Sequence, residues 1–246
     1  MTIAVLTDIH GNREAFEAVL AHARRHGAER FVFLGDFVGY GADPGFVVDT
    51  VAGMAEEGAV ALLGNHDEAV LRSDAGMNPE AQAAIRWTRA QLDDAQRGFL
   101  AGLPLERVDQ DRLYVHANAW SPGRWGYVVG RAQAELSLGS TPQRITFCGH
   151  VHAPALYHQS PGKPPCHFVP LAGEPIPLLP QRRWLAVIGA VGQPRDGNPA
   201  AAYALFEAET QMLRFERVPY DSEAAAEKIR RAGLPDRLSR RLFAGR

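Results

Sequence analysis

The stretch Ile3-Ala4-Val5-Leu6-Thr7-Asp8-Ile9-His10-Gly11-Asn12 sets a pattern that recurs along the chain. Its apolar residues 3–6 are typical of a short buried strand. Asp8 and His10 follow where that strand ends, and both are side chains that bind divalent metal ions. The stretch therefore predicts a strand that carries two metal-ligand side chains at its carboxyl end.

The same arrangement occurs twice more in the first third of the chain. Residues 31–34 form a second apolar run that ends at Gly35-Asp36, and residues 60–63 form a third that ends at Gly64-Asn65-His66-Asp67. Two segments with helical periodicity separate the runs, at residues 13–26 and 44–56. This alternation predicts an α/β sheet, and side chains beyond the carboxyl ends of its strands converge on one crevice.

Two later strands also end at histidine. Residues 112–115 precede His116, and residues 144–147 precede Gly149-His150-Val151-His152. Three further β-rich runs, one with Trp184, indicate a second sheet, at residues 184–188, 201–206 and 212–218. Residues 160–180 are crowded with proline and predict a surface loop.

The segments that carry the candidate ligands lie on both sides of a polar helical region, residues 68–102. We interpret this region as a helical insertion beside the site, and residues 1–246 as a single domain, because the ligands on either side must converge. Residues 221–246 predict a C-terminal helical tail. Its arginines are interpreted as a solvated face rather than a nucleic-acid arm: Arg230, Arg231, Arg237, Arg240 and Arg241.

The composition excludes several classes of protein. With 246 residues and 46% hydrophobic residues, the chain can bury a substantial core, so disorder is excluded. The formal net charge of -2 provides no overall attraction to nucleic acid or anionic lipid. We therefore expect no stable nucleic-acid complex and no membrane association. The sequence carries no indication of the oligomeric state.

Cysteine usage and the first residues bear on the cellular compartment. Cys148 and Cys166 are the only cysteines, which is typical of a reducing cytosol and predicts free thiols. Residues 1–8 lack a basic leader and reach a predicted ligand before an apolar signal core would be complete. No stretch approaches the roughly 18 apolar residues of a membrane span. We expect a cytoplasmic protein.

Taken together, five ordered blocks resemble the calcineurin-like metallophosphoesterase superfamily: Asp8-Ile9-His10, Gly35-Asp36, Gly64-Asn65-His66-Asp67, His116 and Gly149-His150-Val151-His152. The closer resemblance is to the YfcE-like group of small bacterial and archaeal phosphodiesterases. Three further stretches carry it: Gly39-Tyr40-Gly41-Ala42-Asp43-Pro44, Gly192-Gln193-Pro194-Arg195-Asp196-Gly197 and Val218-Pro219-Tyr220-Asp221. The resemblance implies two packed mixed β-sheets flanked by helices, a four-layer αββα sandwich.

The resemblance also implies two divalent ions that share Asp36. The first would be held by Asp8, His10, Asp36 and His152, and the second by Asp36, Asn65, His116 and His150. Oxygen and nitrogen ligands accept Mn²⁺, Fe, Zn²⁺, Ni²⁺ and Co²⁺ alike, so they do not identify the ion; Mn²⁺ is the expected one. The implied reaction is hydrolysis of a small phosphodiester or nucleotide-like substrate by a hydroxide shared between the ions.

Three more side chains are candidates for acting on the substrate. His66 would protonate the leaving oxygen or stabilise the transition state, and Asp67 would orient the His66 imidazole and keep it cationic. Arg195, in a turn rich in glycine and proline, either contacts a substrate phosphate or has a structural role. The arginine found shortly after the second block in protein Ser/Thr phosphatases of the superfamily is missing here, which disfavours phosphoprotein substrates.

Two other functions are compatible with the same residues. A phosphomonoesterase or a dinucleoside-polyphosphate hydrolase uses the same metal centre and differs only in the leaving group. A noncatalytic protein-binding scaffold is the contrasting class, because a fold alone does not specify an activity. Loss of activity usually leaves gaps among the ligands, and this chain has none, so an enzyme is the favoured interpretation.

Overall fold

Alternate residues of strand β1 (Thr2–Leu6) point to opposite faces, and both faces are buried. Ala4 and Leu6 pack in a hydrophobic cluster with helix side chains, whereas Ile3 and Val5 pack in a second cluster formed between two sheets. A strand that is apolar on both faces has to be covered on both sides. The first apolar run of the sequence therefore lies in an inner layer.

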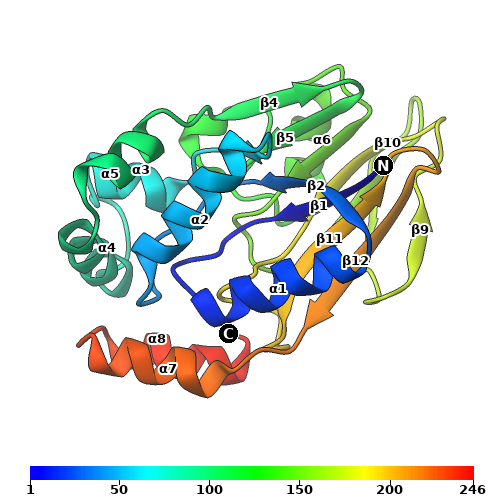
Figure 1. Cartoon of the computed structure of the whole chain (residues 1–246). Helices are drawn as coiled ribbons and strands as arrows, with labels where there is room; N and C mark the ends of the chain where they lie inside the picture. The colour runs from blue at the N-terminus through cyan, green and yellow to red at the C-terminus, as the bar shows by residue number, and fades with distance from the viewer.

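The computed structural model describes residues 1–246 and contains two mixed six-stranded sheets (Figure 1). The first has the order β3 (Val60–Ala61), β2 (Ala28–Phe33), β1, β11 (Ala201–Glu207), β12 (Met212–Val218) and β9 (Pro175–Pro177). The second has the order β4 (Glu106–Asp109), β5 (Arg112–Val115), β6 (Ile145–Cys148), β10 (Arg183–Val187), β7 (Ala155–Gln159) and β8 (Cys166–Phe168).

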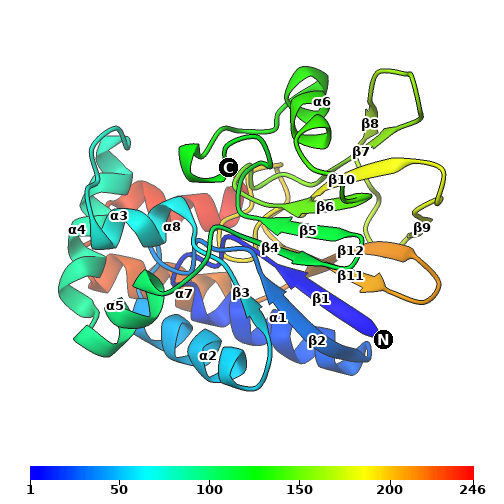
Figure 2. The ribbon, with the colours of Figure 1, turned by 90° about the horizontal axis from the view of Figure 1, so that it is seen from above.

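Helices cover the outer faces of both sheets. Helices α1 (Arg13–Arg25) and α2 (Pro44–Glu56) pack on the first sheet, and α6 (Arg131–Gly139) packs on the second. A short 3-10 helix, η1 (Pro122–Arg124), precedes α6. Figure 2 shows the resulting four layers, with α6 at the top and α1 and α2 at the bottom. The predicted fold class, a four-layer αββα sandwich, is confirmed.

A second group of helices lies at the end of the sheets toward which β1 and β2 run (Figure 2). It comprises α3 (Asn65–Leu71), α4 (Pro79–Gln91), α5 (Asp94–Ala101), α7 (Ser222–Arg231) and α8 (Asp236–Ala244). Side chains of α4, α7 and α8 share one hydrophobic cluster, which includes Ala84, Ile229 and Leu238. The C-terminal helices are thereby attached to the helices that follow β3.

The cap of α1 also ties distant parts of the chain together. The side-chain oxygen of Asn12 accepts a hydrogen bond from the Ala15 backbone N–H at 3.1 Å, as expected for an N-cap. Its side-chain amide donates to the Gly192 carbonyl at 2.9 Å. One asparagine therefore begins the helix and holds the loop after β1 against the loop after β10.

Two expectations from the sequence were wrong. Residues 160–180 are not only a surface loop, because they contain β8 and β9, which pair with β7 and β12. Proline is tolerated in β9 because this strand lies at the sheet edge, where the missing N–H costs no ladder bond. In addition, β11 and β12 join β1 in the first sheet, and of the late β-rich runs only β10 belongs to the second.

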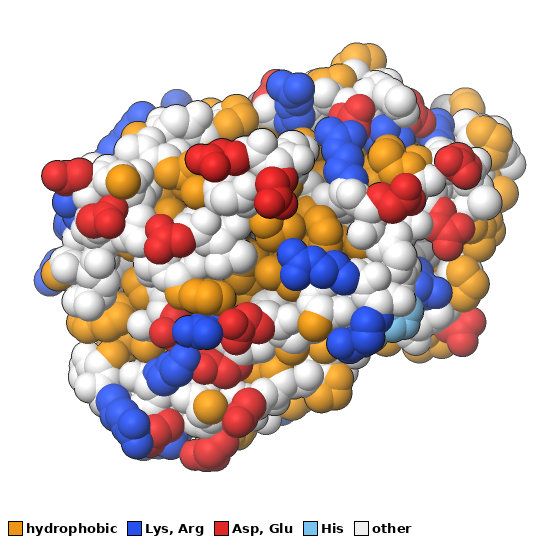
Figure 3. Space-filling model, in the orientation of Figure 1, with side chains coloured by type: hydrophobic (Ala, Val, Ile, Leu, Met, Phe, Trp, Pro, Cys, Tyr) orange, Lys and Arg blue, Asp and Glu red, His pale blue; other side chains and the backbone are white.

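The surface shown in Figure 3 carries acidic and basic side chains interspersed, with no large area of one sign. None of the helices combines the length and the apolar composition needed to cross a lipid bilayer. Cys148 is buried, Cys166 is exposed, and both are free, as predicted.

Candidate metal centre

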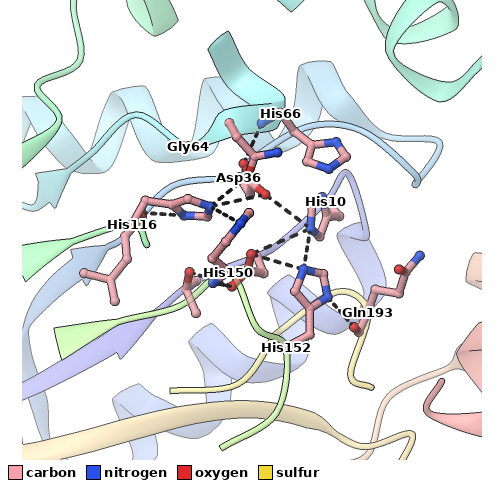
Figure 4. Close-up of polar contacts among 12 residues, drawn as sticks. His10, Asp36, Gly64, His66, His116, His150, His152 and Gln193 are labelled. Carbon is pink, nitrogen blue, oxygen red and sulfur yellow. Dashed lines mark hydrogen bonds and ion pairs between the residues drawn. The ribbon is translucent and has the colours of Figure 1, made fainter. Parts of the chain in front are cut away.

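The predicted metal ligands meet beyond the carboxyl ends of strands from both sheets (Figure 4). Asp8 and His10 follow β1, Asp36 follows β2, and Asn65 is the first residue of α3. From the second sheet, His116 follows β5, and His150 and His152 follow β6. The centre therefore lies where the ends of the two sheets converge, so neither sheet carries it alone.

The ligand atoms form two groups that share Asp36. Within each group the atoms lie within 4.8 Å of one another, and every residue is buried: Asp8, His10, Asp36 and His152 in the first, and Asp36, His116 and His150 in the second. Asn65 adjoins the second group, because its Oδ1 is 3.1 Å from Nε2 of His116. All seven predicted ligands are thus brought together; that they bind metal stays a prediction.

Backbone carbonyls orient three of the four histidines. Nδ1 of His10 donates to Val38 O at 3.0 Å, Nδ1 of His116 to Leu34 O at 3.0 Å, and Nδ1 of His152 to Gln193 O at 2.7 Å. A carbonyl only accepts, so the proton of each neutral ring is on Nδ1. The Nε2 lone pair is then free to face the centre, as in metal-ligating histidines.

These free nitrogens face each other at short range. Nε2 of His10 is 3.1 Å from Nε2 of His152, and Nε2 of His116 is 3.2 Å from Nδ1 of His150. Two lone pairs at this separation repel unless a cation or a proton lies between them. The buried Oδ1 of Asp8 also has no hydrogen-bond donor and lies 3.2 Å from Nε2 of His152. The residues therefore fit divalent ions.

The backbone of the centre is strained. Five ligands adopt the left-handed conformation that side chains rarely occupy, with φ values of 54° at Asp8, 51° at His10, 55° at Asp36, 66° at His150 and 64° at His152. Such conformations cost on the order of 1–3 kcal/mol each and persist only where the surroundings hold them. Their concentration at one place indicates a site whose geometry matters more than its stability.

Two motif glycines permit the close approach of the ligand loops. A Cβ on Gly64 would lie 2.2 Å from both the backbone nitrogen and Oδ1 of Asp36. A Cβ on Gly149 would lie 2.6 Å from Oδ2 of Asp8. Real carbon atoms do not come so close, so only glycine allows these loops to pack against the aspartates.

The expectation that Asp67 orients the His66 imidazole was wrong. Its carboxylate accepts hydrogen bonds from four backbone N–H groups, those of Asp36 at 2.8 Å, Phe37 at 2.9 Å, Val38 at 3.2 Å and Gly64 at 3.0 Å. Burial and the Asp36 charge raise the pKa of Asp67 to about 7, against these hydrogen bonds. Asp67 therefore holds the loop that presents Asp36.

His66 lines a cavity of about 550 Å³ next to the centre, together with Asn65 and His150. Its buried Nδ1 has no hydrogen-bond partner, and its ring centroid lies 4.8 Å from that of His10. Burial lowers the pKa of His66 to about 4, so the ring is neutral at pH 7 in the free protein. No carboxylate keeps it cationic, contrary to the sequence-based expectation.

Opposite charges shape the pKa values of the second ligand group. Burial favours the neutral form of His116, but the Asp36 carboxylate raises the pKa of His116 to about 9 through its charge and a hydrogen bond. Burial, followed by the charge on His116, lowers the pKa of His150 to about 3. In the metal-free protein, a proton on His116 therefore balances the buried carboxylates.

Arg195 lies at the rim of the centre. Its backbone N–H donates to the carbonyl of His152 at 3.0 Å, and its guanidinium carbon lies 5.5 Å from the centroid of the Tyr40 ring. Its Nη2 donates to Oε1 of Gln193 at 2.8 Å. The position is compatible with contact to a substrate phosphate, which stays a prediction.

Three aromatic residues beside the centre were not identified as site residues from the sequence. Tyr40 packs between His10 and His66, with ring centroids 4.6 and 4.5 Å away. Tyr127 stacks on His150 at 4.1 Å, and Trp125 also lines the cavity. For Tyr40, the flanking glycines of Gly39-Tyr40-Gly41 were a usable signal; nothing local distinguished Trp125 or Tyr127.

Comparison with known proteins gives consistent results. The model of the calcineurin-like phosphoesterase superfamily domain matches residues 1–211. The chain is 33% identical to an uncharacterized protein of Methanocaldococcus jannaschii, over 99% of this chain and 98% of that protein. It is also similar to the crystal structure of a metallophosphoesterase from Sphaerobacter thermophilus, with 35% identity, a TM-score of 0.88, and 100% and 99% of the two chains covered.

A second similar structure is that of a hypothetical protein from Pyrococcus horikoshii OT3. It shares 21% identity with this chain and has a TM-score of 0.79, with 100% of this chain and 98% of that chain covered. At this identity the likeness concerns the fold. It extends over the two sheets and the C-terminal helices together.

Proposed function

Because the chain belongs to the calcineurin-like phosphoesterase superfamily, we propose that it is a two-metal-dependent phosphoesterase that hydrolyses a small phosphodiester or nucleotide-like substrate. The observation that carries this proposal is the pair of buried ligand groups that share Asp36. Each contains nitrogen atoms that face each other at 3.1 or 3.2 Å and need a cation or a proton between them.

The set of ligands favours a catalytic over a structural ion. It contains carboxylates and imidazoles, with the Asn65 amide beside them, but no thiolate, and such a set suits Mn²⁺, Fe, Zn²⁺, Ni²⁺ or Co²⁺. When bound, a pair of divalent ions would supply Lewis acidity toward the phosphate oxygens and an activated water at neutral pH. Asp36 would hold both ions, because it is the one residue common to the two groups.

The protein's own contribution to the reaction would come from His66. Its neutral ring at the cavity wall is suited to donate a hydrogen bond to the phosphate or the leaving oxygen. A negatively charged phosphate beside it would also favour its protonated form. Either way, His66 would stabilise charge that develops on the leaving side, whereas Asp67 would act only by holding the Asp36 loop.

The cavity supports a small substrate. Its volume of about 550 Å³ is in the range of small-molecule sites, and Trp125 and Tyr127 offer aromatic surface for a planar leaving group. A phosphomonoesterase or a dinucleoside-polyphosphate hydrolase is the alternative, and Arg195 at the rim of the centre favours the second of these. The positive charge of this arginine would bind a second phosphate of a substrate that carries more than one.

A metal analysis coupled to a substrate panel tests the proposal. We expect about two Mn²⁺ ions per chain and hydrolysis of bis(4-nitrophenyl) phosphate at a higher kcat/KM than 4-nitrophenyl phosphate, and diadenosine tetraphosphate is included to detect the alternative activity. His66→Ala should retain both ions and lose about 10²–10⁴-fold in rate. The exposed His26 provides the matched control, His26→Ala. Metal-loaded protein that cleaves no phosphoester would refute the proposal and favour a scaffold.

A further inference from the structure

Two arginines from distant parts of the chain converge on one buried side chain. Oε1 of Gln193 accepts hydrogen bonds from Nε and Nη2 of Arg195 at 3.2 and 2.8 Å, and from Nη1 of Arg241 at 3.3 Å. Arg195 belongs to the turn after β10, whereas Arg241 lies on α8. Gln193 is only 2% exposed, so it is a fixed anchor for both guanidinium groups.

Neither guanidinium has an acidic partner. The neighbouring arginines are paired: Arg237 with Glu80, Arg240 with Asp236, and Arg217 with Asp196. Arg195 and Arg241 form no ion pair with any carboxylate. Two like charges held on one neutral oxygen repel each other, and partial burial adds to the cost. Such an arrangement is stabilised when an anion binds between or beside the two groups.

The arginine pair is next to the metal centre. The backbone carbonyl of Gln193 accepts the hydrogen bond from Nδ1 of His152, so the same residue orients a candidate ligand and anchors both arginines. The labelled side chains in Figure 4 show Gln193 beside His152. Arg195 lies 5.5 Å from the Tyr40 ring, which in turn lies 4.6 Å from the His10 ring.

The cavity at the metal centre and the cavity beside Arg241 have one wall residue in common. The cavity of about 550 Å³ that His66 lines has Asn78 in its wall. Asn78 also lines a neighbouring cavity of about 450 Å³, and Arg241 is part of that second wall. The cavity at the metal centre and the cavity that Arg241 lines therefore adjoin at Asn78.

We propose that Arg195 and Arg241 form a subsite for a second phosphate group of the substrate, while the scissile phosphate lies at the metal centre. The planar guanidinium groups match phosphate oxygens, and neither is held in an ion pair, because Glu80, which lines the same cavity as Arg241, is paired with Arg237. This inference rests on the proposed function and narrows its substrate class to bisphosphate or polyphosphate esters. It also makes α8, which lies outside residues 1–211, part of the active site and not merely a solvated tail.

A pair of matched substrates tests the subsite. Each substrate is a phosphodiester of 4-nitrophenol and an alkanediol with two, four or six carbons. In one member of each pair the free end of the alkanediol is a hydroxyl, and in the other it is a phosphate. The scissile bond and the leaving group are identical, so the ratio of their kcat/KM values reports only the second phosphate. For the best spacer, we expect a ratio of at least about 10 in the wild-type protein, mainly through KM.

Arg241→Gln should reduce that ratio about tenfold, because the loss on the phosphate-ended substrate exceeds the loss on the hydroxyl-ended one. Arg241→Lys retains the charge and should retain part of the ratio. The neighbouring Arg240, which is paired with Asp236 and exposed, provides the matched control Arg240→Gln. A ratio unchanged in Arg241→Gln would overturn the subsite, as would an equal loss on both substrates, which would indicate a purely structural arginine.

A binding measurement separates this inference from the proposed function. Calorimetry with butane-1,4-diol bisphosphate and with 4-hydroxybutyl phosphate requires no hydrolysis. If the protein cleaves no phosphoester, tighter binding of the bisphosphate that is lost in Arg241→Gln would still support the arginine subsite. If hydrolysis occurs but the two ligands bind equally well to wild type and variant, the proposed function stands and the subsite is excluded.

Discussion

The two ligand groups of the centre differ in how firmly their histidines are held. In the first group, His10 and His152 both donate Nδ1–H to backbone carbonyls, so their rings are fixed before any ion binds. In the second group only His116 is fixed in this way. Nδ1 of His150 faces His116, its Nε2 is buried without a partner, and its ring is held by stacking on Tyr127.

One centre therefore contains a preorganised half, which is the first ligand group, and an adjustable half, which is the second. Hydrogen bonds that orient a ligating histidine contribute about 10–100-fold to metal affinity. We therefore expect the first group to bind an ion more tightly than the second. The adjustable half also borders the cavity, where His150, Asn65 and His66 are lining residues, so it is the half that a substrate would contact.

The largest loss of metal binding and of hydrolysis is expected from substitution of Asp36, which the two halves share. Asp36→Asn keeps the size of the side chain but removes the charge that both ions would need. We expect less than one ion per chain by mass spectrometry of metals, and a loss of at least about 10³-fold in hydrolysis. Asp94→Asn, at a fully exposed aspartate, is the control. Two ions bound with unchanged affinity in Asp36→Asn would contradict a shared carboxylate.

Removal of one histidine from each half tests the difference directly. Titration of chelator-treated wild-type protein with Mn²⁺ should show two binding events whose Kd values differ about 10–100-fold. His150→Ala should retain the tight event, and His152→Ala should lose it. Calorimetry gives both constants. Equal affinities, or loss of the tight event in His150→Ala, would show that the hydrogen bonds to carbonyls do not preorganise the first half.

Removal of metal should reveal a pH dependence of the free energy of unfolding that comes mainly from the second ligand group. The folded-state pKa of His116, about 9, exceeds its ordinary value of 6.5, so its contribution to stability is fully present below pH 6.5 and is lost as the pH rises through 9. In chelator, we expect the free energy of unfolding to fall by about 2 kcal/mol between pH 6.5 and 9.

Urea denaturation at the two pH values provides the measurement. His116→Asn, which cannot take up the proton, should remove most of this dependence and leave the smaller contribution of Asp67, whose raised pKa of about 7 lies in the same range. His150 offers the contrast within the same half, because its pKa of about 3 leaves it neutral over the whole range. A metal-free stability that rises toward pH 9 would show that no proton on His116 replaces the ion.

The smallest change in metal affinity is expected from substitution of Tyr127, whose ring stacks on His150 in the adjustable half. Tyr127→Ala removes the ring stacked 4.1 Å from His150 and should weaken the second Mn²⁺ about threefold, because an aromatic pair contributes about 0.5–1.5 kcal/mol. Tyr127→Phe keeps the ring and should behave like wild type. An equal loss at the first, tighter site would mean that Tyr127 supports the centre as a whole.

Local patterns predicted the α/β sheet, a second sheet and the candidate ligands, whereas the four-layer packing and the division of the ligands between two ions were implied by the family resemblance. Each ligand directly follows an apolar run, and a strand delivers the residue after it to a known edge of the sheet, so position in the sequence predicts position in space. The helix over residues 44–56 was also predicted with the correct bounds, because helical periodicity is a local property of the sequence.

Local patterns could not predict which distant segments pair with each other. The placement of β11 beside β1 depends on backbone hydrogen bonds between strands about 200 residues apart, and the short edge strands β8 and β9 are strands only because a neighbour pairs with them. Asp67 stands next to His66 in the sequence, which suggested a contact, yet the turn of α3 directs its carboxylate to the Asp36 loop instead.

The order of residues along the chain was thus enough to identify which side chains converge at the candidate metal centre, because ligand chemistry and strand ends are both local properties. The tertiary structure alone showed that carbonyls fix three of the four imidazole rings and that an arginine of the last helix reaches Gln193. Those contacts join segments far apart in sequence, and whether they form depends on how the layers pack.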